Sequence, residues 1–405
     1  MRILTGSFWL VTFALTMARA ENNVEALHAV SLGANQFSSS LFQAVIEEKP
    51  GNLIISPLSA GIVLAMAAFG ARGKTESQFR TVLHLPSPDS LATCGYQALI
   101  DNLNNVHENK LALANKAFIA ENFNINSSYK DLTQTYFRSV TQSINFAKSL
   151  EAVNIINRWV EQNTNNLIQD IINTGDIDDS TALVLINAVY FKGQWKNKFS
   201  PDHTKNMPFN VNKNTVKQVP TMYRQGTYKY GELANLNAKF IVIPYKGDEL
   251  SMVIILPNEI DGLAEVEKKL QTTSLTDILN QGFEREIQLY LPKFKIESKI
   301  ELNNILQKMG LIDAFSRNAN FSGISDEELV VTKVVQKAFI EVNEEGSEAT
   351  AVTGIFFMKM SMIISLDFAI TRPFVYYIIK NVYDEKSGTH SILSLFSGHV
   401  NEPKI

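Results

Sequence analysis

Cysteine is almost absent from this 405-residue sequence, in which Cys94 is the only one. A single cysteine excludes any disulfide bond within the chain. A chain of this length buries enough apolar surface to fold without such a cross-link. No catalytic-cysteine motif surrounds Cys94, so we expect it to be an inert, partly buried thiol.

An excess of basic charge is also missing. The 37 Lys and Arg residues are outnumbered by 41 Asp and Glu residues, and the net charge is −4. This mild acidity argues against a general binder of nucleic acids or other polyanions. After residue 20, no apolar run approaches the roughly 20 residues that a membrane-spanning helix needs. We therefore expect neither a nucleic acid nor a membrane as a partner.

The local motifs of common enzyme classes are not found. The sequence has no Gly-x-Ser-x-Gly nucleophile elbow, no phosphate-binding glycine-rich loop and no His-Glu-x-x-His zinc motif. Its six histidines are scattered and make no metal-ligand spacing: His28, His84, His107, His203, His390 and His399. We expect no enzymatic activity, cofactor or metal. A hydrolase is kept as a third class of function, because distant residues can assemble a catalytic triad.

The start of the chain has the features of a secretory signal. Arg2 precedes the mostly apolar residues 8–18, and residues 18–20 read Ala-Arg-Ala, with small side chains at the two positions that define a cleavage site. Residues 1–20 are therefore predicted to be a signal peptide, and the mature, secreted chain to begin at Glu21. A buried N-terminal helix is the less favoured alternative.

Two Asn-x-Ser triplets begin at Asn126 and Asn320. In a secreted protein such a triplet is a candidate acceptor of an N-linked glycan. We predict a glycoprotein with these two candidate sites.

Helical patterns dominate the first part of the sequence and strand patterns the later part. Residues 24–48 and 58–69 have apolar residues at helical spacing. Residues 182–191 form an apolar run broken only by Asn187, which is typical of a strand in a sheet covered on both faces. With no linker or repeat to divide the chain, residues 21–405 are predicted to form a single α+β domain.

Residues 344–373 combine the features of a loop and of a strand. Small and polar residues fill the part from Glu344 to Gly354, and mostly apolar residues follow as far as Ile364. Because successive strand residues point to opposite faces, every second residue from Ser347 would lie on one face, small at one end and bulky at the other. We interpret the segment as an exposed loop that is also able to enter a sheet.

Six motifs occur in a characteristic order and spacing: NLIISPLS at residues 52–59, LINAVYFKGQW at 185–195, LPKF at 291–294, EEGSEA at 344–349, RPF at 372–374 and LFSGHV at 395–400. Together they resemble the motifs of the serpin family, and the resemblance extends from about Ala26 to Asn401. The resemblance implies a fold of three β-sheets and eight or nine helices, with a five-stranded central sheet and an exposed reactive loop toward the C-terminus.

The resemblance also implies a mechanism. A serine protease attacks the loop as a substrate, and the cleaved loop inserts into the central sheet as a new antiparallel strand. The acylated protease is carried across the molecule and its active site is distorted, so that hydrolysis stalls. The chain would then be a suicide-substrate inhibitor and not an enzyme.

Individual roles follow from the matching positions. The resemblance assigns three groups: the loop hinge (Glu344, Gly346, Ser347, Ala349 and Ala351), the breach at the sheet end (Trp195 and Lys293, with Lys293 as partner of Glu344), and the shutter beneath the moving strands (Ser56, Asn187 and Gln336). Gln336 stands where many members of the family have a histidine. Glutamine does not titrate near neutral pH, which puts pH-sensitive opening of the shutter in doubt.

The bond that a protease would cleave is predicted by the family's usual spacing from the hinge glutamate. This spacing favours Met360–Ser361, which suits an elastase-like or chymotrypsin-like protease. Lys359–Met360 is the main alternative and suits a trypsin-like protease with a carboxylate in its specificity pocket. Met362–Ile363 is a third choice.

We expect a monomer whose partners are serine proteases. The main alternative function is that of a non-inhibitory carrier or chaperone with the same fold. In that case, cleavage of the loop would leave thermal stability unchanged.

Overall fold

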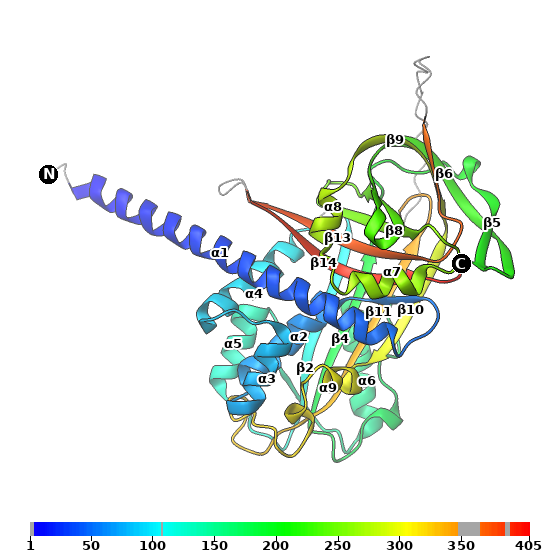
Figure 1. The fold of residues 1–405 in the computed structure, drawn as a ribbon. Coiled ribbons are helices and arrows are strands. Elements are labelled where there is room, and N and C mark those ends of the chain that lie inside the picture. Colours follow the sequence, from blue (N-terminus) through cyan, green and yellow to red (C-terminus); the bar gives the residue numbers. More distant parts are fainter. Residues whose placement is uncertain (1–3, 107, 347–364, 385–388) are drawn as a thin grey trace.

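The computed structural model describes the backbone of residues 4–106, 108–346, 365–384 and 389–405 (Figure 1). Within these residues the helices are α1 (Leu4–Ile46), α2 (Pro57–Gly70), α3 (Gly73–Leu83), α4 (Asp89–Asn104), α5 (Ser127–Phe137), α6 (Ser149–Asn163), α7 (Leu263–Leu270), α8 (Leu275–Asn280) and α9 (Asn303–Lys308). The first six precede most of the strands. The predicted α+β class and the predicted number of helices are confirmed.

A five-stranded sheet forms the centre of the molecule. Its order is β10 (Phe294–Glu301), β11 (Val331–Val342), β4 (Leu183–Lys192), β2 (Lys110–Ala120) and β3 (Gln142–Ile144). β11 and β4 are parallel neighbours, β10 is antiparallel to β11, and β2 is antiparallel to β4 but parallel to β3. The predicted five-stranded central sheet is therefore present.

The remaining strands form one larger, nine-stranded network. Its order is β1 (Leu53–Ile55), β14 (Thr389–Val400), β13 (Phe374–Asp384), β8 (Leu250–Pro257), β7 (Ala238–Pro244), β6 (Thr215–Leu233), β9 (Phe283–Pro292) and β12 (Leu366–Ala369), and β5 (Lys205–Asn212) pairs with β6.

Two of the three expected sheets are continuous here because β6 is long. Its residues 215–221 pair with β5, residues 221–230 with β9, and residues 229–233 with β7. One strand of 19 residues thus passes from one expected sheet into the other. Hydrogen bonding consequently joins the two into a single network.

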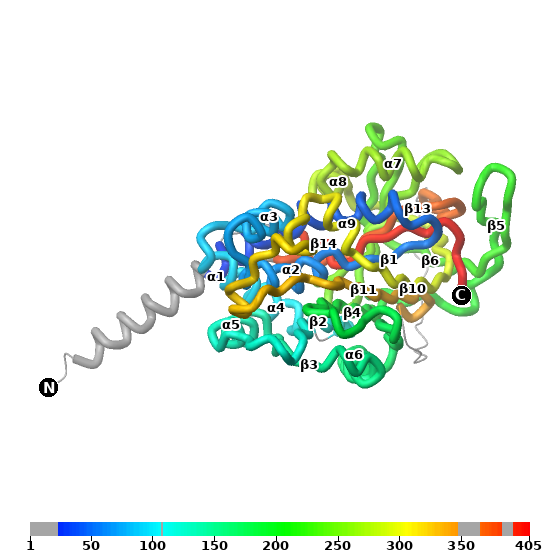
Figure 2. The backbone as a smooth tube through the Cα atoms, turned by 90° about the horizontal axis from the view of Figure 1, so that it is seen from below, coloured from blue at the N-terminus to red at the C-terminus, as the bar shows by residue number. Residues whose placement is uncertain are grey.

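The two faces of the central sheet are covered by different elements. Side chains of β4 alternate: Val184 and Ile186 belong to an apolar cluster with α6, whereas Leu183 and Leu185 belong to the main core. In the view from below, α6 lies next to β2 and β4, and α2 and β14 lie toward the other side (Figure 2). Coverage of both faces explains why β4 is apolar except at Asn187 and at its last residue, Lys192.

α2 is the central helix of the main core. Every one of its 14 residues is buried, and Pro57 occupies its first turn. Proline is tolerated there because the first N–H groups of a helix have no partner within it. The helix begins directly after β1, which places Ser56 under the central sheet.

α1 is one continuous helix from Leu4 to Ile46 and crosses the predicted cleavage point after residue 20. The side chains of residues 1–22 are outside the described part of the chain, so the signal peptide remains a prediction. Beyond them the helix is fixed in the core, where Ala26, Val30 and Phe37 are each about 1% exposed.

Candidate functional site

The hinge begins with a tight turn at the end of β11. The Gly346 N–H donates to the Asn343 carbonyl oxygen (3.1 Å), and the Glu345 N–H donates to Asn343 Oδ1 (3.2 Å). Gly346 has φ +89°, and a Cβ added there would lie 2.3 Å from the Gly193 carbonyl oxygen. Both the backbone conformation and the close approach require glycine at this position.

Glu344 is the anchor of the turn. Its carboxylate accepts from Lys293 Nζ (2.8 Å to Oε2) and from Thr204 Oγ1 (2.8 Å), and its carbonyl oxygen accepts from the Phe199 N–H (3.0 Å). Burial of the carboxylate raises its pKa, but the hydrogen bonds from Lys293 and Thr204 and the charge of Lys293 together lower the pKa below the ordinary glutamate value. The structure thus brings together the predicted Glu344–Lys293 pair.

Trp195 holds the same turn from the other side. Its indole Nε1–H donates to the Asn343 carbonyl oxygen (2.9 Å), and its backbone N–H donates to the Glu345 carbonyl oxygen (3.2 Å). The indole is 2% exposed and stacks on the Tyr245 ring, with 4.5 Å between centroids and 7° between planes. A buried, stacked indole is a rigid platform, so the hinge turn is fixed by side chains from a separate part of the chain.

A cavity of about 470 Å³ lies beside this turn. Tyr190 of β4 and Phe339 of β11 line it together with Lys293 and Glu344. The end of the β4–β11 pair therefore opens into a space next to the hinge.

The predicted shutter residues meet beneath the middle of the central sheet. Gln336 Nε2 donates to the Ser56 carbonyl oxygen (2.8 Å) and to Asn187 Oδ1, and its Oε1 accepts from the Ser56 N–H (2.9 Å). Ser56 Oγ donates to the Leu395 carbonyl oxygen (2.6 Å). Asn187, Ser56 and Gln336 are at most 1% exposed. A polar cluster this deeply buried is stable only because its groups are paired.

Two further residues complete this cluster. Asn187 Nδ2 donates to Ser59 Oγ (2.5 Å) and to Asn115 Oδ1. Asn115, Asn187 and Gln336 stand level with one another on β2, β4 and β11. Sequence reasoning missed Asn115 and Ser59. The available signal was an asparagine on a strand otherwise rich in apolar and small residues.

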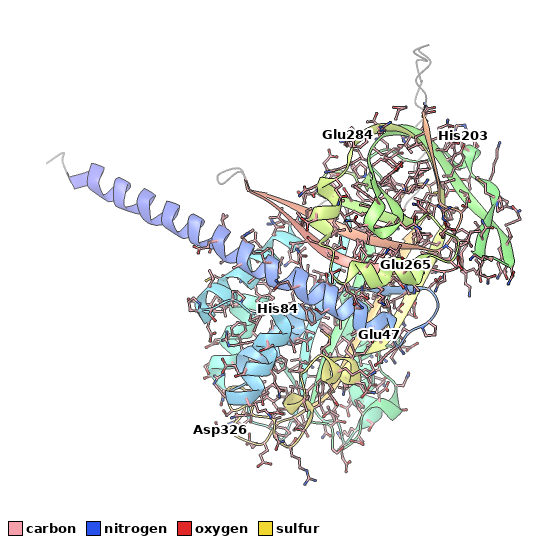
Figure 3. All side chains as sticks on the ribbon, in the orientation of Figure 1. Glu47, His84, His203, Glu265, Glu284 and Asp326 are labelled. Atoms are coloured by element: carbon pink, nitrogen blue, oxygen red, sulfur yellow. The ribbon has the colours of Figure 1, made fainter. Side chains whose placement is uncertain are left out.

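The two ends of the site are far apart in the molecule. His203 adjoins Thr204 at the hinge end, and Asp326 lies in the segment before β11. Figure 3 shows these two labelled residues at opposite ends of the fold. β4 and β11 run between these ends, so a strand placed between them would connect the two poles.

Several predicted site residues lie outside the part of the chain that the structure describes: Ser347, Ala349, Ala351, Lys359, Met360, Ser361, Met362 and Ile363. Their roles remain predictions.

The two candidate glycosylation sites are neighbours on one surface. Asn126 Nδ2 donates to the Ser322 carbonyl oxygen (3.2 Å), and Ser322 Oγ donates to Asn320 Oδ1 (2.8 Å). Asn320 is exposed and Asn126 is half-buried. Triplets separated by almost 200 residues in the sequence thus lie side by side, away from the hinge.

The described residues contain no group of three or more His, Cys, Asp or Glu side chains placed to hold a metal ion. Among the helices that the structure describes, none has the length and apolar character to cross a membrane. Cys94 is a partly buried free thiol on α4.

Comparison with known proteins gives consistent matches. A family model described as Serpin (serine protease inhibitor) matches residues 32–403. Antichymotrypsin-2 of Bombyx mori is 35% identical over 351 residues, which cover 85% of this chain and 93% of the relative. Antitrypsin of Bombyx mori is 34% identical over 373 residues, which cover 91% of this chain and 94% of the relative.

A solved structure matches as well. Serpin48, described as a highly specific serpin in the insect Tenebrio molitor, has a TM-score of 0.83 at 32% identity. The match covers 93% of this chain and 99% of that one.

Proposed function

This chain belongs to the serpin family, and we propose that it is a suicide-substrate inhibitor of serine proteases. Inhibitory relatives support protease inhibition in general. The finer proposal concerns the mechanism: the segment between Gly346 and β12 is the bait, and after cleavage its first part enters the central sheet.

The observation that carries this proposal is the direct parallel pairing of β4 with β11, which leads into the hinge. Gln336 is level with Asn187, and pairing runs along residues 183–191 of β4. A chain that leaves β11 at Gly346 and turns back between the two strands runs antiparallel to both. One parallel ladder is then replaced by two antiparallel ladders, which are slightly more stable per residue.

The length of the loop fits this path. Fourteen residues from Ser347 to Met360 would span roughly 45 Å as a strand at about 3.3 Å per residue. β11 has 12 residues and therefore spans about 40 Å. The cleaved end would reach the opposite pole, where Asp326 lies, and would carry the attached protease with it.

The contacts of the hinge and of the shutter provide the barrier that keeps the loop outside. Entry of a strand must rotate the turn held by Glu344 and Trp195, and it must break the bond between Gln336 and Asn187 that spans β4 and β11. Trp195, Asn187 and Gln336 are buried and Glu344 is half-buried, so their bonds are costly to lose without replacement. Cleavage removes the tether at the far end of the loop and allows the new ladders to form.

The chemistry of the trap is ordinary acyl transfer. The protease serine oxygen attacks the carbonyl carbon of Met360, the peptide bond to Ser361 breaks, and the Ser361 amine leaves with a proton from the protease histidine. Insertion then occurs before water hydrolyses the ester. Lys359–Met360 is the alternative bond and would select a trypsin-like protease.

The proposal extends to the setting in which the protein acts. We propose that residues 1–20 are removed as a signal peptide and that the mature chain is a secreted, monomeric glycoprotein. We also propose that Asn126 and Asn320 carry N-linked glycans. Neither side chain lies near the hinge contacts described above, so glycans at these positions would leave the hinge free.

The test uses the mature chain, residues 21–405, mixed with trypsin, chymotrypsin and elastase in turn. We expect a covalent complex that survives boiling in detergent with at least one of them. The first residue of the released C-terminal fragment would be Ser361 for the favoured bond and Met360 for the alternative. Cleavage of the loop without complex formation, across a broad panel of serine proteases, would contradict inhibition and favour the carrier or chaperone alternative.

A further inference from the structure

Lys116 occupies an unusual position on the outer face of the central sheet. Its ammonium nitrogen lies 5.3 Å from the ring centroid of Phe118 and 5.1 Å from that of Trp159. Phe118 belongs to β2, whereas Trp159 belongs to α6, and the two rings meet edge to face at 5.8 Å and 78°. The lysine thus bridges the sheet and the helix that covers it.

The strand alternation explains how a lysine comes to lie there. Asn115 and Ala117 face the main core and the buried polar cluster, so Lys116 and Phe118 face α6. Within the part of the chain that the structure describes, the ammonium group of Lys116 lies over these two rings and forms no ion pair with a carboxylate. Burial lowers the pKa of Lys116, which agrees with a cation that has given up part of its hydration.

Such an arrangement is attractive because the face of an aromatic ring carries partial negative charge. A cation within about 6 Å of a ring centroid is stabilised, and indole is the strongest of the aromatic partners. Two rings on different elements make the contact a cross-link between β2 and α6. Methionine in place of lysine would keep the apolar stem but lose this attraction.

The position of α6 gives the cross-link a consequence. The apolar cluster beneath α6 includes Ile186 of β4 and also Val335 and Phe339 of β11. A strand that enters between β4 and β11 must pass under this cluster and separate the two sides of it. The strength with which α6 is held on β2 therefore contributes to the resistance that an entering strand meets.

We propose that Lys116 is a positioning residue that fastens α6 to β2 through Phe118 and Trp159 and thereby slows entry of the loop into the sheet. The first half of this proposal concerns the intact molecule. The second half rests on the proposed inhibitory function.

The first experiment measures hydrogen exchange in the uncleaved mature chain. Because one cation–π contact is lost, Lys116→Met is expected to speed exchange of the α6 amides by about threefold to tenfold. Lys116→Arg retains a cation over the rings and is expected to stay within about twofold of the natural chain. Equal exchange in Lys116→Met and in the natural chain would overturn the cross-link. A Lys116→Arg variant as fast as Lys116→Met would also overturn it, because shape and not charge would then be responsible.

The second experiment follows the same variants after the loop is cut by a protease that is not trapped. The rate at which the cleaved chain becomes resistant to urea reports insertion. The Lys116→Met variant is expected to insert its loop about threefold to tenfold faster than the natural chain. The insertion rate of Lys116→Arg is expected to be close to that of the natural chain. Equal rates would overturn the effect on insertion. If even the natural chain gains no resistance, the proposed function fails, and the exchange comparison still decides the cross-link.

Discussion

Gly346 shows most directly how a single residue fixes the hinge. Its φ of +89° lies in a region that side chains rarely adopt, and an added Cβ would approach the Gly193 carbonyl oxygen to 2.3 Å. The family resemblance assigned Gly346 to the loop hinge. The structure adds a second requirement, because the turn presses against the backbone of another segment.

We predict that Gly346→Ala loosens the hinge turn and lowers the free energy of unfolding by about 1–3 kcal/mol, because strain and steric overlap add at one position. Scanning calorimetry measures the change. Gly175→Ala is the matched control, since a Cβ at Gly175 meets nothing within 4 Å. Equal melting temperatures for both variants would refute the steric account.

Glu344 is a titratable residue of the turn that begins the predicted hinge, and the direction of its pKa shift sets a pH dependence. The folded-state pKa is below the ordinary value of 4.5. A lowered folded-state pKa stabilises the folded chain above the ordinary value, and this stabilisation is lost as the pH falls through the lower, folded-state pKa.

We predict that Glu344→Gln is less stable than the natural chain at pH 7 and that the difference shrinks as the pH falls below about 4.5. Thermal melts at a series of pH values measure this, with Glu341→Gln, an exposed carboxylate on β11, as the control. A difference that is constant from pH 7 to pH 3 would show that the charge of Glu344 is not the stabilising feature.

At the scale of elements, the β4–β11 pair is the part of the fold that must open in the proposed mechanism. Two amide side chains join the two strands to the start of α2: Gln336 of β11 bonds to Asn187 of β4 and to the backbone N–H and carbonyl groups of Ser56. Their bonds lie beneath the line along which a new strand would enter. The central sheet is thus held closed by a few polar bonds as well as by its own ladder.

We predict that Gln336→Ala destabilises the chain by about 1–3 kcal/mol, because the buried Ser56 N–H and Asn187 Oδ1 lose the hydrogen bonds that Gln336 makes to them. The same change should speed spontaneous loop insertion in uncleaved protein at elevated temperature, which native gels would follow. Gln225→Ala, a change of the same kind at an exposed strand position, is the control. A Gln336→Ala variant that melts and converts like this control would argue against a restraining role for the polar cluster.

At the scale of the whole molecule, the proposed mechanism requires the five-stranded central sheet to accept a sixth strand after cleavage. Under this proposal, insertion would bury the apolar residues Ile355 and Phe357 and would add a full set of ladder bonds. Apolar burial at roughly 25 cal/mol per Å² makes those two side chains alone worth a few kcal/mol. The cleaved chain should accordingly be the more stable form.

We predict that cleavage of the loop raises the melting temperature by about 10 °C or more, because the inserted strand adds both hydrogen bonds and buried area. Calorimetry before and after cleavage measures the shift. Ser347→Arg places a large charge at the first residue to enter and should abolish the gain. An unchanged melting temperature in the natural chain would indicate a carrier or chaperone in place of an inhibitor.

The sequence by itself determined the features that depend on local pattern. The apolar run around Asn187 identified a covered strand, whereas the hinge role of the small residues after Glu344 remains a prediction. Resemblance of six motifs then gave the fold, and through it the pairing of Glu344 with Lys293. The predictions of the strand, the fold and the pair succeeded because periodicity and motif spacing are properties of short stretches.

Only the tertiary structure decided which distant residues complete each group. Four residues show this: Thr204 at the hinge, Asn115 and Ser59 in the polar cluster, and Lys116 between two rings. Each has a partner that lies tens of residues or more away in the sequence. Phe118, the second ring beside Lys116, is the one near neighbour. The continuity of the larger sheet through β6 also came from the structure alone. Such contacts depend on how packed elements are placed against one another, because a polar or charged side chain pairs with whatever packing brings within reach.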